Sequence, residues 1–161
     1  MWGNDMSSDF ARIILCTLPE ARAVAMGDKD YSSLYGVVSF YPAGKGTLIT
    51  AEVNGLPQTQ TNIYAMHIHQ GSSCTGNEQD PFADTGGHYN PGNLPHPEHL
   101  GDLPPLFGNG GFAYYSFYTE KFRPSDVIGR TVVIHHQPDD FKTQPSGDSG
   151  RKIGCGVIKK V

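Results

Sequence analysis

The sequence has little of what marks several protein classes. It contains only three cysteines and one tryptophan among 161 residues, and its apolar runs stay well short of the roughly 18 residues that a membrane helix needs. A net charge of -4 gives no excess of Lys and Arg for binding nucleic acid or an anionic membrane, so an anionic substrate would depend on local positive groups. We therefore expect a soluble protein without a nucleic-acid or membrane partner.

The N-terminal segment lacks the pattern of a targeting signal. Met1–Glu20 has no basic start, and its apolar stretch Phe10–Leu18 is interrupted by Arg12 and followed by no small-residue cleavage site. We expect a cytoplasmic protein, with secretion or the cell envelope as the alternative if a leader has been removed. Within the apolar stretch, Cys16 is expected to be a buried small hydrophobic residue.

The length of 161 residues suits one domain, and 20 Gly and 12 Pro indicate many turns. Two segments, Leu48–Val53 and Val132–His135, show the period-two alternation of a half-buried strand, and no segment shows a convincing helical period. This pattern predicts an antiparallel β sandwich or barrel. Its strands are expected at Ala21–Met26, Leu34–Tyr41, Thr47–Val53, Asn62–His69, Gly111–Tyr118 and Arg130–His135.

Two stretches, Gln70–Gly110 and His136–Gly150, carry no strand signal. A structureless loop as long as the first would normally count against the strand assignment. Metal ligands and a disulfide can fix such loops, and both stretches contain suitable residue types.

All seven histidines lie between His67 and His136. Residues two apart on a strand point to the same face, so His67 and His69 would present two imidazoles side by side. The pair predicts two metal ligands. An ordinary half-exposed strand is the alternative for this pair taken alone.

A second group of ligand-type residues lies in the segment GGHYNPGNLPHPEHLGD, which contains His88, His96, His99 and Asp102. Three imidazoles and one carboxylate form a closed tetrahedral set, which is typical of a structural zinc site. A solvated polar loop is the alternative, but such a loop has little reason to hold four ligand-type residues so close together.

His135 ends a hydrophobic strand and, with His67, His69 and His88, completes a four-nitrogen set suited to copper. His88 then belongs to both sets, which requires an imidazolate that bridges copper and zinc. His136 has no comparable partner and is expected to be exposed.

The motifs HIHQGSSC, GGHYNP, PEHLGDLPPL, GRTVVIHHQPDD and SGRKIGCGVI resemble those of the copper/zinc superoxide dismutase family in its bacterial form, in order and spacing. The resemblance implies an eight-stranded Greek-key β-barrel with long metal-binding and electrostatic loops. It runs from about residue 21 to the C-terminus, so we expect a barrel domain at 21–161. Residues 1–20 remain an unassigned N-terminal extension.

The resemblance also implies an activity and the residues that carry it. Superoxide would be converted to oxygen and hydrogen peroxide by cycling a copper ion, with zinc structural and with His88 and Lys152 as catalytic residues. Copper would bind His67, His69, His88 and His135, and zinc would bind His88, His96, His99 and Asp102.

Two further features follow from the same resemblance. A disulfide would join Cys74 to Cys155, although two reduced thiols remain the alternative for a cytoplasmic protein. Asp139 would hydrogen-bond one copper histidine and one zinc histidine, and Asp140 beside it could be confused with it.

The sequence departs from the family beside the copper site. Lys152 stands where the family commonly has arginine, three residues before Cys155, with Arg151 one step earlier. A one-residue slip could bring Arg151 into the site instead, but the register counted from Cys155 favours Lys152. A solvated basic pair is the alternative.

Two other functions remain open at this point. The fold could serve a copper-binding or copper-buffering protein with little turnover, or a purely structural zinc-stapled sandwich. The sequence also leaves open a homodimer.

Overall fold

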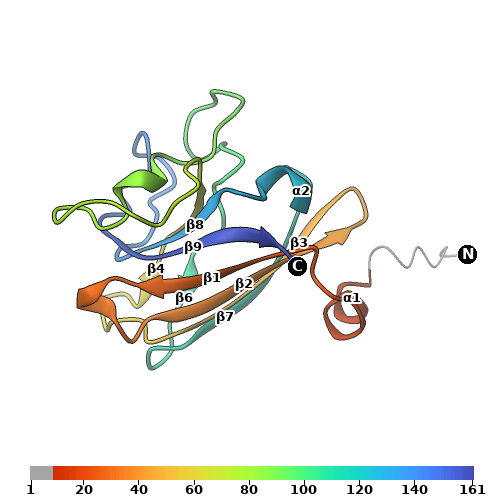
Figure 1. The fold of residues 1–161 in the computed structure, drawn as a ribbon, viewed down its shortest axis with the longest axis horizontal. Helices are drawn as coiled ribbons and strands as arrows, with labels where there is room; N and C mark the ends of the chain where they lie inside the picture. Colours follow the sequence, from red (N-terminus) through yellow and green to blue (C-terminus); the bar gives the residue numbers. More distant parts are fainter. Residues whose placement is uncertain (1–8) are drawn as a thin grey trace, which may run out of the picture.

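The structure is a computed structural model that describes residues 9–161, and this part of the chain is built mainly from β-strands (Figure 1). The helices are short: α1 (Phe10–Cys16), α2 (Pro124–Val127), and the 3-10 turns η2 (Lys29–Tyr31) and η3 (Ala83–Thr85). The strands are β1 (Ala21–Gly27), β2 (Tyr35–Ala43), β3 (Gly46–Asn54), β4 (Ile63–Tyr64), β5 (Met66–His69), β6 (Leu106–Phe107), β7 (Ala113–Thr119), β8 (Thr131–His135) and β9 (Lys152–Lys160).

One curled sheet contains seven of these strands in the order β5-β8-β9-β1-β2-β3-β7, and β4 pairs with β6 in a second, two-stranded ladder. Every pairing is antiparallel. Only Ala65 separates β4 from β5. If these two are taken as one interrupted strand, the described residues contain the eight strands expected, and the all-β fold is confirmed.

The core follows the predicted alternation along several strands. In β1, Ala21, Ala23 and Ala25 are fully buried, whereas the residues between them point outward. The small alanines let the large side chains of Phe40 and Ile49 fill the space inside the curled sheet. Burying these side chains supplies the main driving force for closing the sheet.

The prediction that Val132–His135 is half-buried is wrong, because every residue of β8 is buried. Val132 and Ile134 face the main core. On the opposite face, Val133 packs with Phe82 and Cys155. The long loops therefore cover a strand face that a bare sheet would expose to water.

Two strands lie outside the segments predicted from alternation. The two-residue strand β6 falls within the long stretch 70–110, and β9 contains Gly154 and Gly156, which weaken its strand signal. The rest of 70–110 and all of 136–150 form loops that gather on one side of the sheet, at the upper left of Figure 1.

Helix α1 covers part of the outer sheet face. The Asp9 carboxylate accepts a hydrogen bond from the backbone N–H of Arg12, which caps the first turn. Phe10 and two isoleucines of the helix pack against a small cluster on β2 and β3 that includes Leu48. The helix therefore buries Leu48 on a face of β3 that would otherwise meet water.

The prediction that Cys16 is buried is wrong, because it is exposed. Helix α1 packs through Phe10, Ile13 and Ile14, which share one face, and Cys16 lies off that face. The first eight residues of the expected extension lie outside the described part of the chain. Within residues 9–161, no helix has the length and apolar character required to span a membrane.

Candidate metal centre

The centre is built on the free edge of β5. His67 and His69 are both buried on this strand, with 0% and 2% of their surface exposed. Backbone hydrogen bonds join Ile68 to two parts of the long loop, from Tyr89 N to Ile68 O at 2.8 Å and from Ile68 N to Gly101 O at 2.8 Å. The loop therefore runs along the strand edge at two places.

Those two contacts bring the next ligand-type residues into position. His88 forms an isolated β-bridge with His69, and Asp102 forms one with His67. Gly101 permits this close approach, because a Cβ atom there would lie 2.1 Å from the carbonyl oxygen of Ile68. Ordinary strand hydrogen bonding thus places loop side chains next to the histidines of β5.

The first cluster brings together the four histidines expected to bind copper. One ring nitrogen from each lies within 4.8 Å of those of the others, and all four residues are buried. Nε2 of His69 lies 3.2 Å from Nε2 of His135, and the rings of His67 and His88 are 4.0 Å apart between centroids. The members of this cluster are His67, His69, His88 and His135.

Hydrogen bonds to backbone carbonyls orient two of these imidazoles. Nδ1 of His69 donates to Gly86 O at 2.8 Å, and Nδ1 of His135 donates to Gly150 O at 3.2 Å. Because the proton of each ring is then on Nδ1, the lone pair is on Nε2. These lone pairs lie at the short contact between the two rings, where one metal ion could accept both.

The remaining two histidines carry the clearest sign of a metal site. Nε2 of His67 donates to Asp139 Oδ2 at 2.8 Å, which leaves the lone pair on Nδ1. Among the described residues, Nδ1 of His67 and Nε2 of His88 are buried and have no hydrogen-bond partner. Buried polar atoms are rarely left unsatisfied, so this donor set fits a metal ion.

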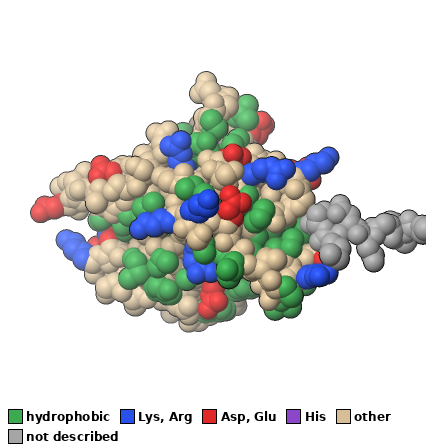
Figure 2. Space-filling view, turned by 45° about the vertical axis from the view of Figure 1, so that its right-hand side comes forward, with side chains coloured by type: hydrophobic (Ala, Val, Ile, Leu, Met, Phe, Trp, Pro, Cys, Tyr) green, Lys and Arg blue, Asp and Glu red, His purple; other side chains and the backbone are tan. Residues whose placement is uncertain are grey.

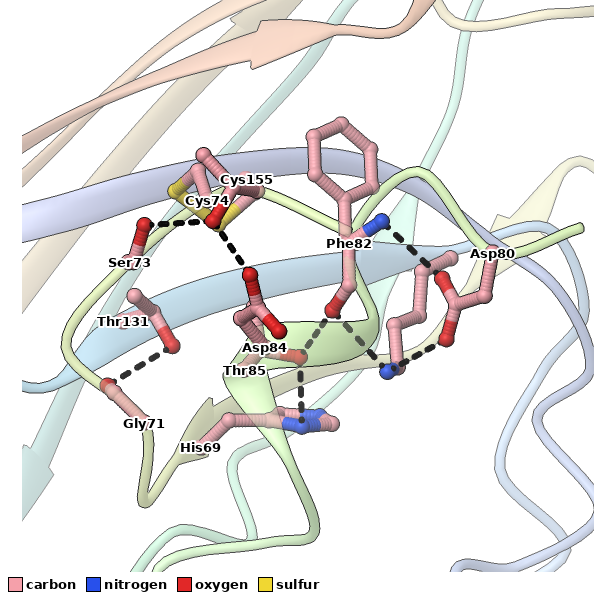
Figure 3. The surroundings of a disulfide bond; sticks show 12 residues. His69, Gly71, Ser73, Cys74, Asp80, Phe82, Asp84, Thr85, Thr131 and Cys155 are labelled. Carbon is pink, nitrogen blue, oxygen red and sulfur yellow. Dashed lines mark hydrogen bonds and ion pairs between the residues drawn. A yellow bond between two sulfur atoms is a disulfide. The ribbon is translucent and has the colours of Figure 1, made fainter. Parts of the chain in front are cut away.

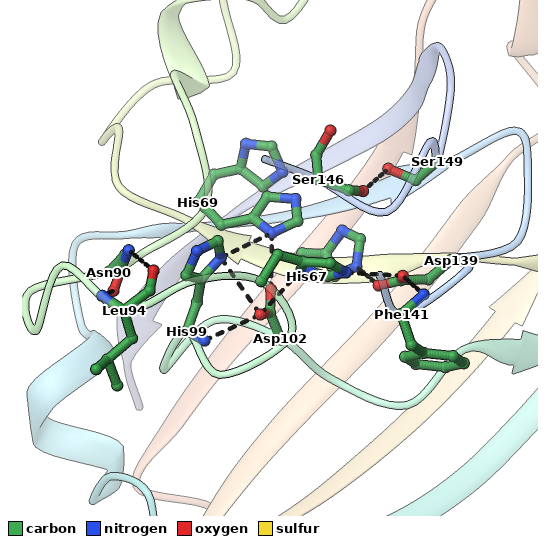
Figure 4. A network of polar contacts seen from close by, with 12 residues as sticks. His67, His69, Asn90, Leu94, His99, Asp102, Asp139, Phe141, Ser146 and Ser149 are labelled. Carbon is green, nitrogen blue, oxygen red and sulfur yellow. Dashed lines mark hydrogen bonds and ion pairs between the residues drawn. The ribbon is translucent and has the colours of Figure 1, made fainter. Parts of the chain in front are cut away.

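The second cluster contains three imidazoles around one carboxylate. Asp102 lies 2.7 Å from His88 Nδ1, 3.1 Å from His96 Nδ1 and 3.3 Å from His99 Nδ1. The four potential ligand atoms lie within 4.8 Å of one another. This closed set of nitrogen and oxygen donors has the composition of a structural zinc site (Figure 4).

His88 belongs to both clusters through different atoms. Its Nδ1 faces Asp102, while its Nε2 is the buried nitrogen without a partner. The two ring nitrogens therefore serve two separate donor sets.

Asp139 contacts one histidine of each cluster. Its two carboxylate oxygens accept hydrogen bonds from Nε2 of His67 and, at 2.9 Å, from Nε2 of His96. Burial alone would raise the pKa of Asp139, but hydrogen bonds from His67, the Phe141 backbone and His96 lower it to about 2. The loop passes very close to Asp139 at Gly147. Only glycine fits there, because a Cβ atom at position 147 would lie 1.9 Å from an Asp139 oxygen.

Asp140 has a different role from its neighbour. Its carboxylate accepts hydrogen bonds from the backbone N–H groups of Lys142 and Thr143, which closes a local turn. The structure therefore places Asp139, and not Asp140, against the histidines.

Burial lowers the pKa of several histidines of the first cluster. The pKa of His67 is lowered, that of His69 falls well below its usual value, and that of His135 falls to about 3. Desolvation is the main cause in each case, because a buried imidazolium is poorly solvated. Neutral imidazole is the form that binds a metal.

The disulfide between Cys74 and Cys155 is present, as expected, and Cys16 is the free cysteine among the described residues (Figure 3). It joins the loop after β5 to the middle of β9. Phe82 packs against it, so the loop segment that supplies Gly86 O is anchored to the sheet.

A cavity of about 440 Å³ lies beside the first cluster, and His69, His88 and His135 form part of its lining. Lys152 also lines this cavity. Arg151 points elsewhere, with its guanidinium 2.6 Å from Asp28. Lys152 is therefore the basic residue in the wall of this cavity, and Arg151 is held away from it by Asp28.

Two outcomes were not expected from the sequence. His136 is half-buried instead of exposed, with its ring 6.1 Å from that of Tyr31, and it belongs to neither cluster. The carbonyls of Gly86 and Gly150, which orient two histidines, were not anticipated because a backbone oxygen leaves no residue-type signal in the sequence.

Comparison with known proteins agrees with this geometry. A sequence model described as copper/zinc superoxide dismutase matches residues 34–158. The chain is 33% identical over 144 residues to a Cu-Zn superoxide dismutase of Deinococcus radiodurans, covering 78% of each chain. It is 32% identical to superoxide dismutase [Cu-Zn] 2 of Aquifex aeolicus, covering 77% of this chain and 78% of the relative.

A third relative, the extracellular Cu-Zn superoxide dismutase of Rattus norvegicus, is 31% identical over 83% of this chain and 58% of its own length. The relatives thus include bacterial and extracellular proteins. The chain belongs to the copper/zinc superoxide dismutase family, a family of oxidoreductases.

Proposed function

We propose that this protein is a superoxide dismutase that holds one copper and one zinc ion. One observation carries the proposal: two donor sets share His88 through its two ring nitrogens, and the nitrogen facing the first set is buried without a partner among the described residues. The overall reaction takes two superoxide anions and two protons to one oxygen and one hydrogen peroxide.

We assign copper to His67, His69, His88 and His135, and zinc to His88, His96, His99 and Asp102. Four nitrogens suit copper, and a closed set of nitrogens with one carboxylate suits zinc. Copper supplies one-electron redox chemistry when bound. Zinc has no redox chemistry and has a structural role.

The chain orients the imidazole rings that would bind the metals. Gly86 O and Gly150 O fix the rings of His69 and His135, and Asp139 fixes His67 together with a zinc histidine. Such outer contacts hold the tautomer and direction of each ligand. His88 is the residue placed to take up and release a proton at Nε2, because its other ring nitrogen, Nδ1, lies against Asp102 within the zinc set.

We assign anion guidance to Lys152, which lines the cavity beside the copper cluster. Acidic and basic side chains are scattered over the face shown in Figure 2, and the net charge is -4. A uniform positive surface therefore does not attract the anion, and a local cation in a recess is less screened than one on open surface.

Superoxide decay per bound copper tests the proposal against a copper-buffering protein of the same fold. We expect rapid, copper-dependent decay in stopped-flow measurements on protein loaded with both metals, and only the uncatalysed background decay with protein loaded with zinc alone. Stoichiometric copper binding with decay no faster than for the zinc-only protein would contradict the proposal. Binding of zinc only would favour the structural zinc-stapled sandwich.

A pair of variants tests the shared histidine. His88→Ala should weaken zinc binding and abolish turnover together, because it removes a ligand from both sets. His136→Ala is the matched control, because His136 follows His135 in the sequence but lies outside both clusters. Its zinc affinity and its turnover should stay near wild type. Normal zinc affinity and activity in His88→Ala would refute the bridge.

The assembly and compartment are separate proposals. We propose a homodimer, supported by apolar side chains that share the outer sheet face and are about half exposed: Val24, Met26, Tyr35 and Tyr114. In a two-fold dimer this patch on one copy would cover the same patch on the other. Sedimentation at micromolar concentration should give twice the chain mass, and a monomer throughout would contradict it. We propose the cytoplasm as the compartment. Recovery of the protein outside the cytoplasmic fraction in cell fractionation would contradict this.

We also propose that residues 21–161 form the domain. A chain starting at residue 21 should retain both metals and their ratio, although removing α1 exposes Leu48.

A further inference from the structure

The cation at the cavity wall is paired with a carboxylate from outside the cavity. Lys152 Nζ donates to Asp80 Oδ2 at 2.8 Å and to the backbone oxygen of Phe82 at 3.1 Å (Figure 3, where Asp80 and Phe82 are labelled). We propose that Asp80 is a positioning residue that fixes Lys152 and lowers its attraction for incoming anions. This inference rests on the proposed function, because it assigns Lys152 to anion guidance.

Lys152 is the only lysine or arginine among the described residues that line the cavity, and no acidic residue lines it. Its side chain is 16% exposed, so much of its charge is removed from bulk water. The charge of this one side chain therefore has a large effect on whether an anion enters.

Asp80 is itself held firmly in the loop. Its backbone N–H donates to Asn77 Oδ1 at 2.9 Å, and its Oδ1 accepts from the backbone N–H of Phe82 at 3.0 Å. The other carboxylate oxygen, Oδ2, is the one that meets Lys152. This arrangement fixes the carboxylate before it contacts the lysine, so the lysine is held by a preorganised acceptor.

The ion pair has two opposed effects on an anion in the cavity. It holds the flexible lysine side chain at the wall, which favours a defined approach. It also places a negative charge directly behind the ammonium group, which reduces the positive potential that the anion experiences. The two effects can be separated, because asparagine can keep the hydrogen bond without the charge.

The charge effect is tested with Asp80→Asn and the matched control Glu78→Gln. Glu78 is exposed on the same loop, so the control removes an equal charge at a site two residues away. The first readout is the dissociation constant of azide, a small anion, for copper-loaded protein, measured by absorbance titration at low and high salt. The second is the rate constant for superoxide decay over the same salt range.

Asp80→Asn should bind azide about three-fold more tightly at low salt and show a steeper loss of affinity and rate with ionic strength. Glu78→Gln should change both by clearly less. Wild-type affinity and salt slope in Asp80→Asn, or equal effects in the two variants, would overturn the charge role.

The positioning effect is tested without copper. In zinc-loaded protein, acetylation of Lys152 by an amine-reactive reagent can be followed by peptide mass spectrometry, with the exposed Lys142 as internal reference. Asp80→Ala should raise the relative acetylation of Lys152 several-fold, and Asp80→Asn should raise it less. Unchanged acetylation in Asp80→Ala would overturn the positioning role. Absent turnover in wild type would instead refute the proposed function, and the acetylation result would still stand by itself.

Discussion

Removing the Cys74–Cys155 disulfide should destabilise the metal-free protein strongly. The two cysteines are separated by 81 positions, so the bond closes a long loop in the unfolded chain. The chain-entropy relation gives about 4.5 kcal/mol for a loop of this length at 25 °C. A typical domain has a total stability of about 5–15 kcal/mol, so this loss is a large fraction of it.

The variant Cys74→Ala/Cys155→Ala avoids burying a hydroxyl group at Cys155, which is 3% exposed. The free energy of unfolding should be measured by urea titration of the metal-free proteins, with Cys16→Ala as the matched control. Because Cys16 is exposed and unbonded, we expect its removal to change stability by less than about 0.5 kcal/mol. A loss below about 1 kcal/mol in the double variant would refute the entropic reasoning.

The same variant should affect the two metals unequally. Gly86 O, which orients His69, follows the loop segment that the disulfide anchors. Asp102 and His88 are held by contacts to β5 that do not involve this bond. We therefore expect copper affinity to fall more than zinc affinity, and an equal loss of both would show that the bond supports the whole loop.

Three further predictions concern single features of the site. Asp139→Ala should weaken both metals by roughly 10- to 100-fold in equilibrium titrations, because it orients one histidine of each set; an effect on one metal alone would contradict its double role. Gly101→Ala should cost at least about 2 kcal/mol in urea unfolding, since its Cβ would clash with Ile68 O, and a near-neutral result would show that the loop can move away. Burial lowers the pKa of His135 to about 3, so the unfolded chain binds more protons there below its ordinary pKa of about 6.5. The stability of the metal-free protein should consequently fall as pH drops from 6.5 toward 3, and a stability independent of pH in that window would contradict a buried neutral His135.

Which ligand-type residues lie together was easier to predict from the sequence than the packing around them. Histidines at 67 and 69 share a strand face by simple periodicity, and His88, His96, His99 and Asp102 are close in sequence, so their meeting needed little long-range information. Burial of β8 on both faces depends on where the long loops fold back, which local periodicity does not encode. The exposure of Cys16 likewise depends on which helix face meets the sheet.

Contacts made through the backbone or through a loop carboxylate could not be predicted from the sequence. Gly86 O and Gly150 O act through atoms that every residue possesses, so no residue type marks them. Nothing in the sequence singles out Asp80, and only the folded loop shows that it meets Lys152.

The central claim is that two metals share His88, and anomalous X-ray diffraction from crystals of the copper- and zinc-loaded protein tests it most directly. Data collected at the copper and zinc absorption edges locate each metal separately. The account predicts copper beside Nε2 of His88 and zinc beside its Nδ1, with the other ligands as assigned. Two metals with no common histidine ligand, or one metal alone, would contradict it.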